Sequence, residues 1–227
     1  MTSEITIITT PFFLKVSVNC YLVRDHDGFF LIDTGRSNKR WEIEKEMARA
    51  SCRQGDLKLI LLTHGDFDHC GNAAYFREKF GAKIAMHNDD SGMVEYGDMT
   101  WNRKKQNILI RTILGLMVRL SEADRFKPDI FLEDGDDLSE KGLEAIVIHI
   151  PGHSLGSVAF LTAGGELFCG DLLANTDKPD IWSIIDDPVA AAASIDKLKE
   201  FEIGGVYPGH GDTFTMVQFR QNYSPSP

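Results

Sequence analysis

Short apolar runs, separated by glycine-rich or polar turns, recur along the whole chain. Apolar runs of strand length, bounded by turn residues, predict strands over 5–8, 16–23, 29–32, 57–62, 83–86, 143–150, 158–162 and 166–169. Apolar residues at helical spacing predict helices over 39–50, 73–80 and 188–201. In the first of these helices, Trp41, Ile43 and Met47 are the expected core residues, and 218–227 is expected to be a frayed tail. The pattern predicts a mixed α/β (α+β) chain.

One polar turn carries an unusual density of metal-binding side chains. The segment 63–72 lies between the predicted strand 57–62 and the predicted helix 73–80, and it contains His64, Asp66, Asp68 and His69. Imidazole and carboxylate groups are the usual ligands of zinc, iron and manganese. A turn can direct several such groups to one point, whereas a strand sends neighbouring side chains to opposite faces. Taken alone, a polar turn with two histidines is more often solvated than metal-bound.

Three later strands end in the same way, and this recurrence changes the interpretation. His153 lies in a Pro-Gly-His-Ser turn after the run 145–150, and His210 lies in a Pro-Gly-His-Gly turn after Val206 and Tyr207. Asp171 follows Cys169 and Gly170 at the end of another predicted strand. Glycine lets the backbone approach a site closely at such turns. Four strand ends that converge at one sheet edge would form a two-metal cluster.

With these motifs the chain resembles the metallo-β-lactamase superfamily of metallohydrolases. The family signature is His-x-His-x-Asp-His, followed by a histidine, a bridging aspartate and a last histidine. The resemblance covers nearly the whole chain and implies a single domain over 1–227, folded as a four-layer αββα sandwich with the metals at one edge of its two sheets. It also implies a bracing role for Asp33 and the following metal ligands: His64, residue 66 and His153 for the first ion, Asp68, His69 and His210 for the second, and Asp171 as the bridge. The chain departs from the signature at one position, where Asp66 replaces the second histidine.

The segment 88–129 is the least regular part of the chain. It corresponds to the place where this superfamily often inserts a helical segment over the active-site mouth. Its stretch 101–120 predicts a helix that is dense in apolar residues. Packing against the core, a lid with an apolar face toward the substrate, a homodimer contact and, least favoured, a membrane-surface helix are the open alternatives.

Charge and composition narrow the range of partners. The net charge of −10 disfavours nucleic acid as a partner, because nucleic-acid binding requires a basic patch. No uncharged apolar run reaches the roughly 18 residues of a membrane span, and no signal-peptide pattern is present. The scattered Cys20, Cys52, Cys70 and Cys169 are expected to be free thiols in a cytoplasmic protein, with Cys70 or Cys169 as a possible neighbour of the ligands. His87 and His149 are expected to be structural histidines.

The ligand set predicts two divalent metal ions, zinc in the first place, with iron or manganese as alternatives. A hydroxide activated by the metals, with Asp68 and Asp171 as catalytic residues, would attack an ester, thioester, lactone or similar small substrate. Asp66 keeps a second function open, because two histidines and one carboxylate also form the iron site of non-haem oxidoreductases. The third alternative is a non-catalytic relative that binds a metal or a ligand.

Overall fold

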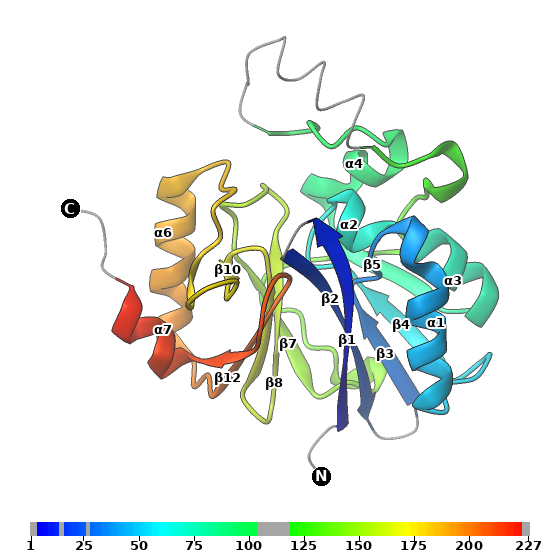
Figure 1. The fold of residues 1–227 in the computed structure, drawn as a ribbon, viewed down its shortest axis with the longest axis horizontal. Helices are drawn as coiled ribbons and strands as arrows, with labels where there is room; N and C mark the ends of the chain where they lie inside the picture. The colour runs from blue at the N-terminus through cyan, green and yellow to red at the C-terminus, as the bar shows by residue number, and fades with distance from the viewer. Residues whose placement is uncertain (1–3, 14–15, 26–27, 104–118, 224–227) are drawn as a thin grey trace.

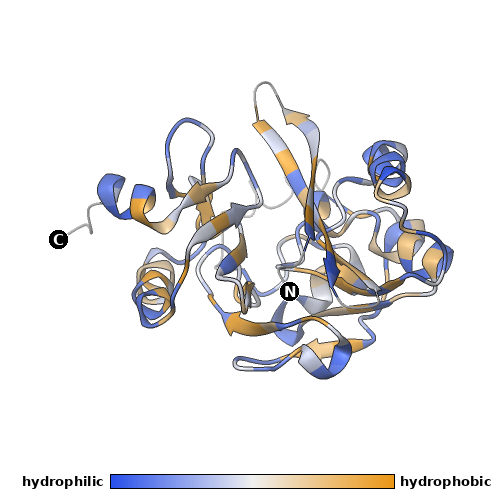
Figure 2. Cartoon of the chain, turned by 90° about the horizontal axis from the view of Figure 1, so that it is seen from below, coloured by the Kyte–Doolittle hydropathy of each residue, from blue (hydrophilic) through white to orange (hydrophobic). Residues whose placement is uncertain are grey.

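Two β-sheets face each other and helices cover the outer side of each, in the computed structural model of the chain (Figure 1). The structure describes residues 4–13, 16–25, 28–103 and 119–223. The layers are therefore helix, sheet, sheet and helix, which is the αββα sandwich that the family resemblance implies. Polar and apolar residues both occur along the helices, whereas the strands are largely apolar (Figure 2).

The first sheet has the order β1-β2-β3-β4-β5-β6. Its first three strands pair in antiparallel fashion, and β3 to β6 are parallel. Helices α1 (Arg40–Arg49) and α3 (Ala73–Phe80) lie against its outer face (Figure 1). The strands are β1 (Glu4–Phe13), β2 (Val16–Asp25), β3 (Gly28–Ile32), β4 (Leu57–Leu61), β5 (Lys83–His87) and β6 (Ile130–Leu132).

The second sheet has the order β13-β12-β9-β8-β7, with β12 parallel to β9 and the other pairs antiparallel. Helix α6 (Pro188–Lys197), its extension η5 (Leu198–Glu200) and α7 (Met216–Asn222) cover its outer face (Figure 1). The strands are β7 (Ala145–His149), β8 (Val158–Thr162), β9 (Glu166–Gly170), β12 (Gly205–Pro208) and β13 (Phe214–Thr215), beside a separate pair, β10 (Leu173–Ala174) and β11 (Asp180–Ile181).

Short helical turns connect these layers. The loop after β4 continues directly into α2 (Phe67–Cys70), which lies at the edge of the first sheet. The remaining turns are η1 (Ser37–Lys39), η2 (Asn88–Asp90), α4 (Ser91–Tyr96), η3 (Glu122–Asp124) and η4 (Ser139–Lys141).

The core between the two sheets is built from apolar side chains of both. Phe30 and Leu61 from the first sheet belong to the same buried cluster as Val147, Phe160 and Phe168 from the second. A second cluster fills the space between the first sheet and α1 and α3, and a third fills the space under α6 and α7. Burial of these apolar surfaces holds the strand ends, and therefore the loops that follow them, in fixed relative positions.

Two local predictions are wrong. Trp41 is 75% exposed, and only Ile43 and Met47, four residues apart on one face of α1, enter the core. The segment expected to be a frayed tail begins inside α7, where Thr215 and Gln218 form a capping box and Phe219 is buried in the third cluster. The last four residues, 224–227, lie outside the described part of the chain.

The described flanks of the segment 88–129 pack on the first core cluster, to which Met93, Val94, Met99, Leu120 and Phe126 contribute. The helix predicted over 101–120 falls mostly on 104–118, outside the described residues. None of the helices in the described ranges has the length and apolar character needed to cross a membrane.

Candidate metal centre

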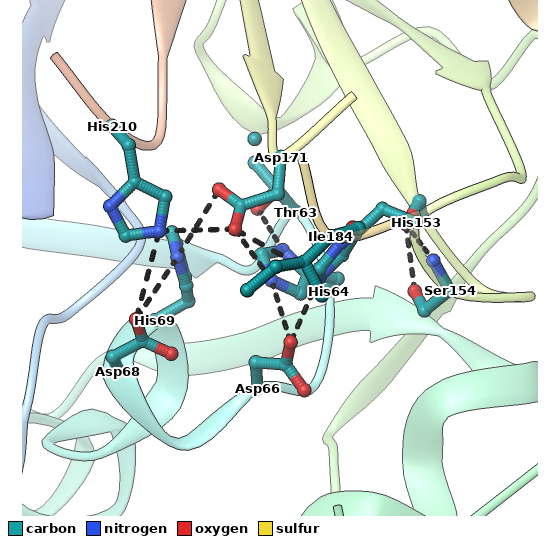
Figure 3. A network of polar contacts seen from close by, with 12 residues as sticks. Thr63, His64, Asp66, Asp68, His69, His153, Ser154, Asp171, Ile184 and His210 are labelled. Carbon is teal, nitrogen blue, oxygen red and sulfur yellow. Dashed lines mark hydrogen bonds and ion pairs between the residues drawn. The ribbon is translucent and has the colours of Figure 1, made fainter. Parts of the chain in front are cut away.

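The loops that follow β4, β7, β9 and β12 meet at one edge of the two sheets, with their side chains converging (Figure 3). The carboxyl ends of the parallel pair β9 and β12 lie side by side, and the facing sheet contributes β4 and α2. The structure thereby brings together all seven residues that the sequence proposed: His64, Asp66, Asp68, His69, His153, Asp171 and His210.

The side chains form two groups that could each hold an ion. His64, Asp66 and His153 form the first group, and Asp68, His69 and His210 the second; in each, the candidate ligand atoms lie within 4.8 Å of one another. The His64 Nε2–Asp66 Oδ2 distance is 3.6 Å, and the His210 Nε2–Asp68 Oδ2 distance is 3.7 Å. Two ligands of one tetrahedral zinc are about 3.4 Å apart. Both groups are therefore close to ligand spacing.

Asp171 lies between the two groups. Its Oδ1 is 3.4 Å from His69 Nε2, and its Oδ2 is 3.1 Å from His210 Nε2. The same Oδ2 is 3.9 Å from His153 Nε2 and 4.0 Å from His64 Nε2. One carboxylate thus reaches both groups, as a bridging ligand must.

All four histidines of the centre point Nε2 inward and bond Nδ1 outward. The carbonyl oxygens of Ile184 and Ser17 can only accept, so their partners His153 and His210 must carry the proton on Nδ1. Such outer contacts fix the tautomer and the ring orientation of metal-binding histidines. The Nδ1 contacts are His64 to Thr63 Oγ1 (2.9 Å), His69 to Asp33 Oδ2 (2.9 Å), His153 to Ile184 O (2.6 Å) and His210 to Ser17 O (2.7 Å).

Three atoms inside the centre are buried without a hydrogen-bond partner among the described residues: His64 Nε2, His69 Nε2 and Asp171 Oδ1. Burying an unpaired polar atom is costly, and native proteins rarely leave one unsatisfied. Each of these atoms has a lone pair that a cation can take up. The donor set and its unpaired atoms therefore fit bound divalent metal.

Asp33 braces the centre as expected. Its carboxylate accepts hydrogen bonds from the backbone and the hydroxyl of Thr63 at 2.9 Å and 2.8 Å, and it contacts His69. Asp33 itself has a φ of 55°, a left-handed conformation that an aspartate tolerates better than most residues. This single buried side chain contacts His69 of the second group directly and reaches His64 of the first group through Thr63 Oγ1.

Asp90 is a second buried brace, and the sequence analysis missed it. Its carboxylate accepts hydrogen bonds from Gly65 N (3.1 Å), Ser154 Oγ (2.6 Å) and Gly156 N (2.8 Å). It thereby connects the loop of His64 to the loop of His153. No local pattern distinguishes Asp90 from the acidic residues around it, so only the structure could reveal this role.

Arg103 is another residue of the centre that the sequence did not indicate. Its Nη2 donates to Asp66 Oδ1 at 2.6 Å, and its Nη1 donates to the carbonyl oxygen of His153 at 3.3 Å. Burial by itself would raise the pKa of Asp66, but the Arg103 guanidinium and the neighbouring His153 hold that pKa far below its ordinary value. Asp66 is therefore an ionised carboxylate with a buried cation beside it.

A cavity of about 240 Å³ opens onto the centre. The Trp182 ring stacks on the ring of His210 with a centroid distance of 4.5 Å. The aromatic part of the cavity lining is therefore in contact with the second ligand group. The walls away from the ligands are mostly apolar and comprise Phe12, Phe67, Met99, Trp182 and Ile184.

The other two histidines singled out from the sequence form a pair of their own. The rings of His87 and His149 stack at 4.3 Å, nearly parallel, and His149 Nε2 donates to the Leu155 carbonyl at 2.8 Å. Together with Asp89 they form a further group with metal-binding atoms. Parallel ring planes cannot both contain one ion, so the stacked arrangement does not present both rings to the same metal. That these histidines are structural stays a prediction.

The four cysteines are free and buried. Cys70 Sγ donates to the carbonyl of Gly65 at 3.3 Å, within the loop that carries four candidate ligands. Burial raises the pKa of all four thiols, which keeps them protonated.

Comparison with known proteins gives a consistent result. A family model described as the metallo-beta-lactamase superfamily matches residues 14–210. The chain is 28% identical over 226 residues to the acyl-coenzyme A thioesterase MBLAC2 of Bos taurus, covering 90% of this chain and 78% of that protein. It is 29% identical over 160 residues to the hydroxyacylglutathione hydrolase GloC of Haemophilus influenzae, covering 68% of this chain and 66% of that protein.

Solved structures show the same fold. TTHA1623 in a di-iron-bound form superposes with a TM-score of 0.70 at 27% identity, covering 90% of this chain and 92% of that one. The BLEG-1 B3 metallo-beta-lactamase superposes with a TM-score of 0.72 at 22% identity, covering 98% of both chains. The second likeness concerns the fold alone.

Proposed function

The chain belongs to the metallo-β-lactamase superfamily, and from that premise we propose that it is a metal-dependent hydrolase of small acyl esters and thioesters. The observation that carries the proposal is the set of inward-facing, unpaired atoms of His64, His69 and Asp171 between two ligand groups. Its relatives MBLAC2 and GloC are named as a thioesterase and a hydroxyacylglutathione hydrolase, and both names support hydrolysis.

In this proposal two divalent ions are held by the groups described above. His64, Asp66 and His153 would hold the first, Asp68, His69 and His210 would hold the second, and Asp171 would be shared between them. When bound, such ions supply Lewis acidity and lower the pKa of a water molecule toward neutrality. Zinc suits the four imidazoles and is our first choice, with iron or manganese as alternatives.

The carboxylates of the chain orient the nucleophile and handle its proton. His210 Nε2 lies 3.7 Å from Asp68 Oδ2 and 3.1 Å from Asp171 Oδ2, so both carboxylate oxygens are near the same imidazole nitrogen. A water molecule between these oxygens can donate hydrogen bonds to them, which aims its lone pair at the substrate. Asp68 then accepts the proton and delivers it to the leaving group.

The walls of the cavity favour a substrate with an apolar portion next to the reacting carbonyl. Phe12, Met99, Trp182 and Ile184 offer apolar contacts, while the polar groups of the cavity are concentrated among the ligands and Arg103. An acyl chain fits this distribution, and a thiol or alcohol leaving group would extend toward solvent.

A second function is favoured by Asp66 and by the di-iron form of a relative. Two histidines and one carboxylate form the first group, and the relative TTHA1623 was crystallised with two irons. In that case the chain would be a non-haem iron oxidoreductase. A non-catalytic metal-binding relative is the remaining alternative.

The partner we propose is a small molecule rather than nucleic acid, because the net charge of −10 repels polyanions. A homodimer through the segment 88–129 remains a proposal. The buried, free cysteines support a reducing location such as the cytoplasm.

Hydrolysis by the metal-loaded protein tests the proposal. Protein loaded in turn with zinc, iron and manganese is assayed with nitrophenyl esters and acyl thioesters of increasing chain length, with a nitrophenyl phosphodiester as the control substrate. We expect turnover of esters and thioesters that chelator abolishes and added metal restores. Oxygen consumption by the iron form without ester turnover would instead establish the oxidoreductase. If fully metallated protein showed neither activity, the non-catalytic relative would be the remaining alternative.

Ile184 provides a separate test of the acyl site. Its side chain is 59% exposed at the cavity, while its backbone carbonyl holds His153. We expect Ile184→Asn to raise KM for long-chain esters about fivefold and to leave acetyl ester hydrolysis unchanged, because about 1 kcal/mol of apolar contact is lost. Val217→Asn, at another exposed apolar side chain, is the matched control. An equal effect on short and long chains would argue against an acyl-binding wall.

A further inference from the structure

The departure of Asp66 from the family signature has a partner elsewhere in the chain. We propose that Arg103 is a positioning residue that works with Asp66, so that the two residues together replace the missing histidine at the first metal site. This inference rests on the proposed function, since it assumes that the first group holds a metal. The inference gives Arg103 a role that could not be predicted from its position in the irregular segment after α4.

The contact leaves Asp66 with one oxygen for the metal. Arg103 Nη2 lies 2.6 Å from Asp66 Oδ1, and Asp66 Oδ2 lies 2.9 Å from His153 Nε2 and 3.6 Å from His64 Nε2. A free aspartate can rotate and offer either oxygen or both. With Oδ1 held by Arg103, only Oδ2 faces the imidazoles, so Asp66 presents a single donor atom, as a histidine would.

Charge leads to the same conclusion. Asp66 adds a third carboxylate to Asp68 and Asp171, where the family signature has a neutral imidazole. The guanidinium is permanently cationic and offsets this extra negative charge. The Arg103 and Asp66 side chains are only 11% and 17% exposed, so solvent and salt screen the pair weakly. The net charge of the first group with Arg103 included therefore equals that of a three-histidine site.

Arg103 also acts on the next ligand. Its Nη1 donates to the carbonyl oxygen of His153 at 3.3 Å. A single guanidinium thus holds the side chain of one ligand and the backbone of another, although the two are far apart in the sequence. Planar guanidinium groups are suited to this double contact, whereas lysine offers a single compact ammonium.

The segment that carries Arg103 is anchored to the fold. The Trp101 indole packs so closely on Gly92 of α4 that any Cβ at that position would clash with the ring. Asn102 has a φ of 55° and donates from its side chain to the Asp89 carbonyl at 2.9 Å. These contacts set the position of Arg103 before any metal binds, which is what a positioning residue requires.

A double-mutant cycle tests the inference through metal affinity, measured without substrate. The variants are Arg103→Met, Asp66→His and the double substitution, together with Arg103→Lys. Zinc affinity of each site is measured by competition with a chromophoric chelator, and cobalt absorption reports the coordination of the first site. Removing an outer contact of a ligand typically costs about 10- to 100-fold in metal affinity.

We expect Arg103→Met to weaken zinc at the first site at least about tenfold, with a smaller loss for Arg103→Lys. In the Asp66→His background, Arg103→Met should leave the affinity unchanged or improve it, because an imidazole needs no neighbouring cation. Arg36→Met is the matched control, since the Arg36 guanidinium lies over the rings of Phe12 and Phe67 at the same mouth. It should leave first-site affinity unaltered.

Equal losses from Arg103→Met in both backgrounds would mean that Arg103 acts through the fold alone, and no loss in either would remove its role entirely. Thermal unfolding of the metal-free variants identifies any that fail to fold, and Arg103→Lys then carries the comparison. If the wild-type chain binds two ions and hydrolyses esters but the cycle shows no coupling, only this inference fails. If it binds no divalent metal, the proposed function fails with it.

Discussion

The double substitution His64→Ala with His153→Ala is expected to lower the metal content from two ions per chain to one and to reduce ester hydrolysis by at least about 10³-fold. Both imidazoles belong to the first group, and their Nε2 atoms face the same carboxylates. Only Asp66 and the shared carboxylate of Asp171 would remain there, and without an imidazole these are too few protein ligands to retain an ion against water. Elemental analysis of purified protein, together with initial rates, measures both effects.

The fold should survive this change. His64 and His153 lie at strand ends rather than in the three apolar clusters, and His64 Nε2 has no hydrogen-bond partner to lose among the described residues. The control is His87→Ala with His149→Ala, which removes an equally sized, stacked pair outside the seven-residue centre. Full metal content in the first variant, or loss of metal in the control, would show that the ligand assignment is wrong.

Replacement of the shared carboxylate, Asp171→Asn, is expected to weaken metal at both sites and to reduce hydrolysis by about 10³-fold. The substitution keeps the shape of the side chain, removes its charge and replaces one acceptor oxygen by an NH2 donor. Asp171 lies within 4.0 Å of the Nε2 atoms of His64, His69, His153 and His210, so its charge acts on both groups. Burial opposes ionisation, but the neighbouring His210 and His69 hold the pKa of Asp171 well below its ordinary value.

Zinc titration separates this prediction from the first. Asp171→Asn should shift both binding steps to higher zinc concentration, whereas the histidine double variant should abolish one step and preserve the other. Asp177→Asn, at an exposed aspartate near β10, is the matched control and should bind and hydrolyse like the wild type. If Asp171→Asn altered one binding step alone, Asp171 would belong to a single site and would not be the bridge.

The role of Asp66 changes once Arg103 is considered. From the sequence, a third carboxylate should donate more charge to the metal and shift preference from zinc toward iron or manganese. In the structure the guanidinium of Arg103 contacts Asp66 Oδ1 and offsets that charge. Restoring histidine by Asp66→His would then place a cation beside a neutral ligand, so we expect the gain in zinc affinity to be at least as large when Arg103 is also replaced.

The sequence by itself determined the strands β1 to β5 and β7 to β9, the helices α1, α3 and α6, and the candidate ligands. These features are local: an apolar run of strand length sets the strand, and a glycine-bearing turn directly after it sets where His153, Asp171 and His210 lie. Because each ligand-bearing turn begins where a strand ends, the order of the motifs was sufficient to propose that they meet at one sheet edge. The spacing of Ile43 and Met47 likewise predicted a buried face for α1.

Only the tertiary structure decided which distant residues support that centre. Asp66 is 37 residues from Arg103, and Ser154 is 64 residues from Asp90, so no periodicity or turn motif connects them. Packing also overrode local composition, exposing Trp41 and drawing Phe219 of the presumed tail into the core. The physical reason is the same in each case. Strand and turn propensities depend on residues that are adjacent in the sequence, whereas burial and charge pairing depend on which distant residues the fold brings into contact.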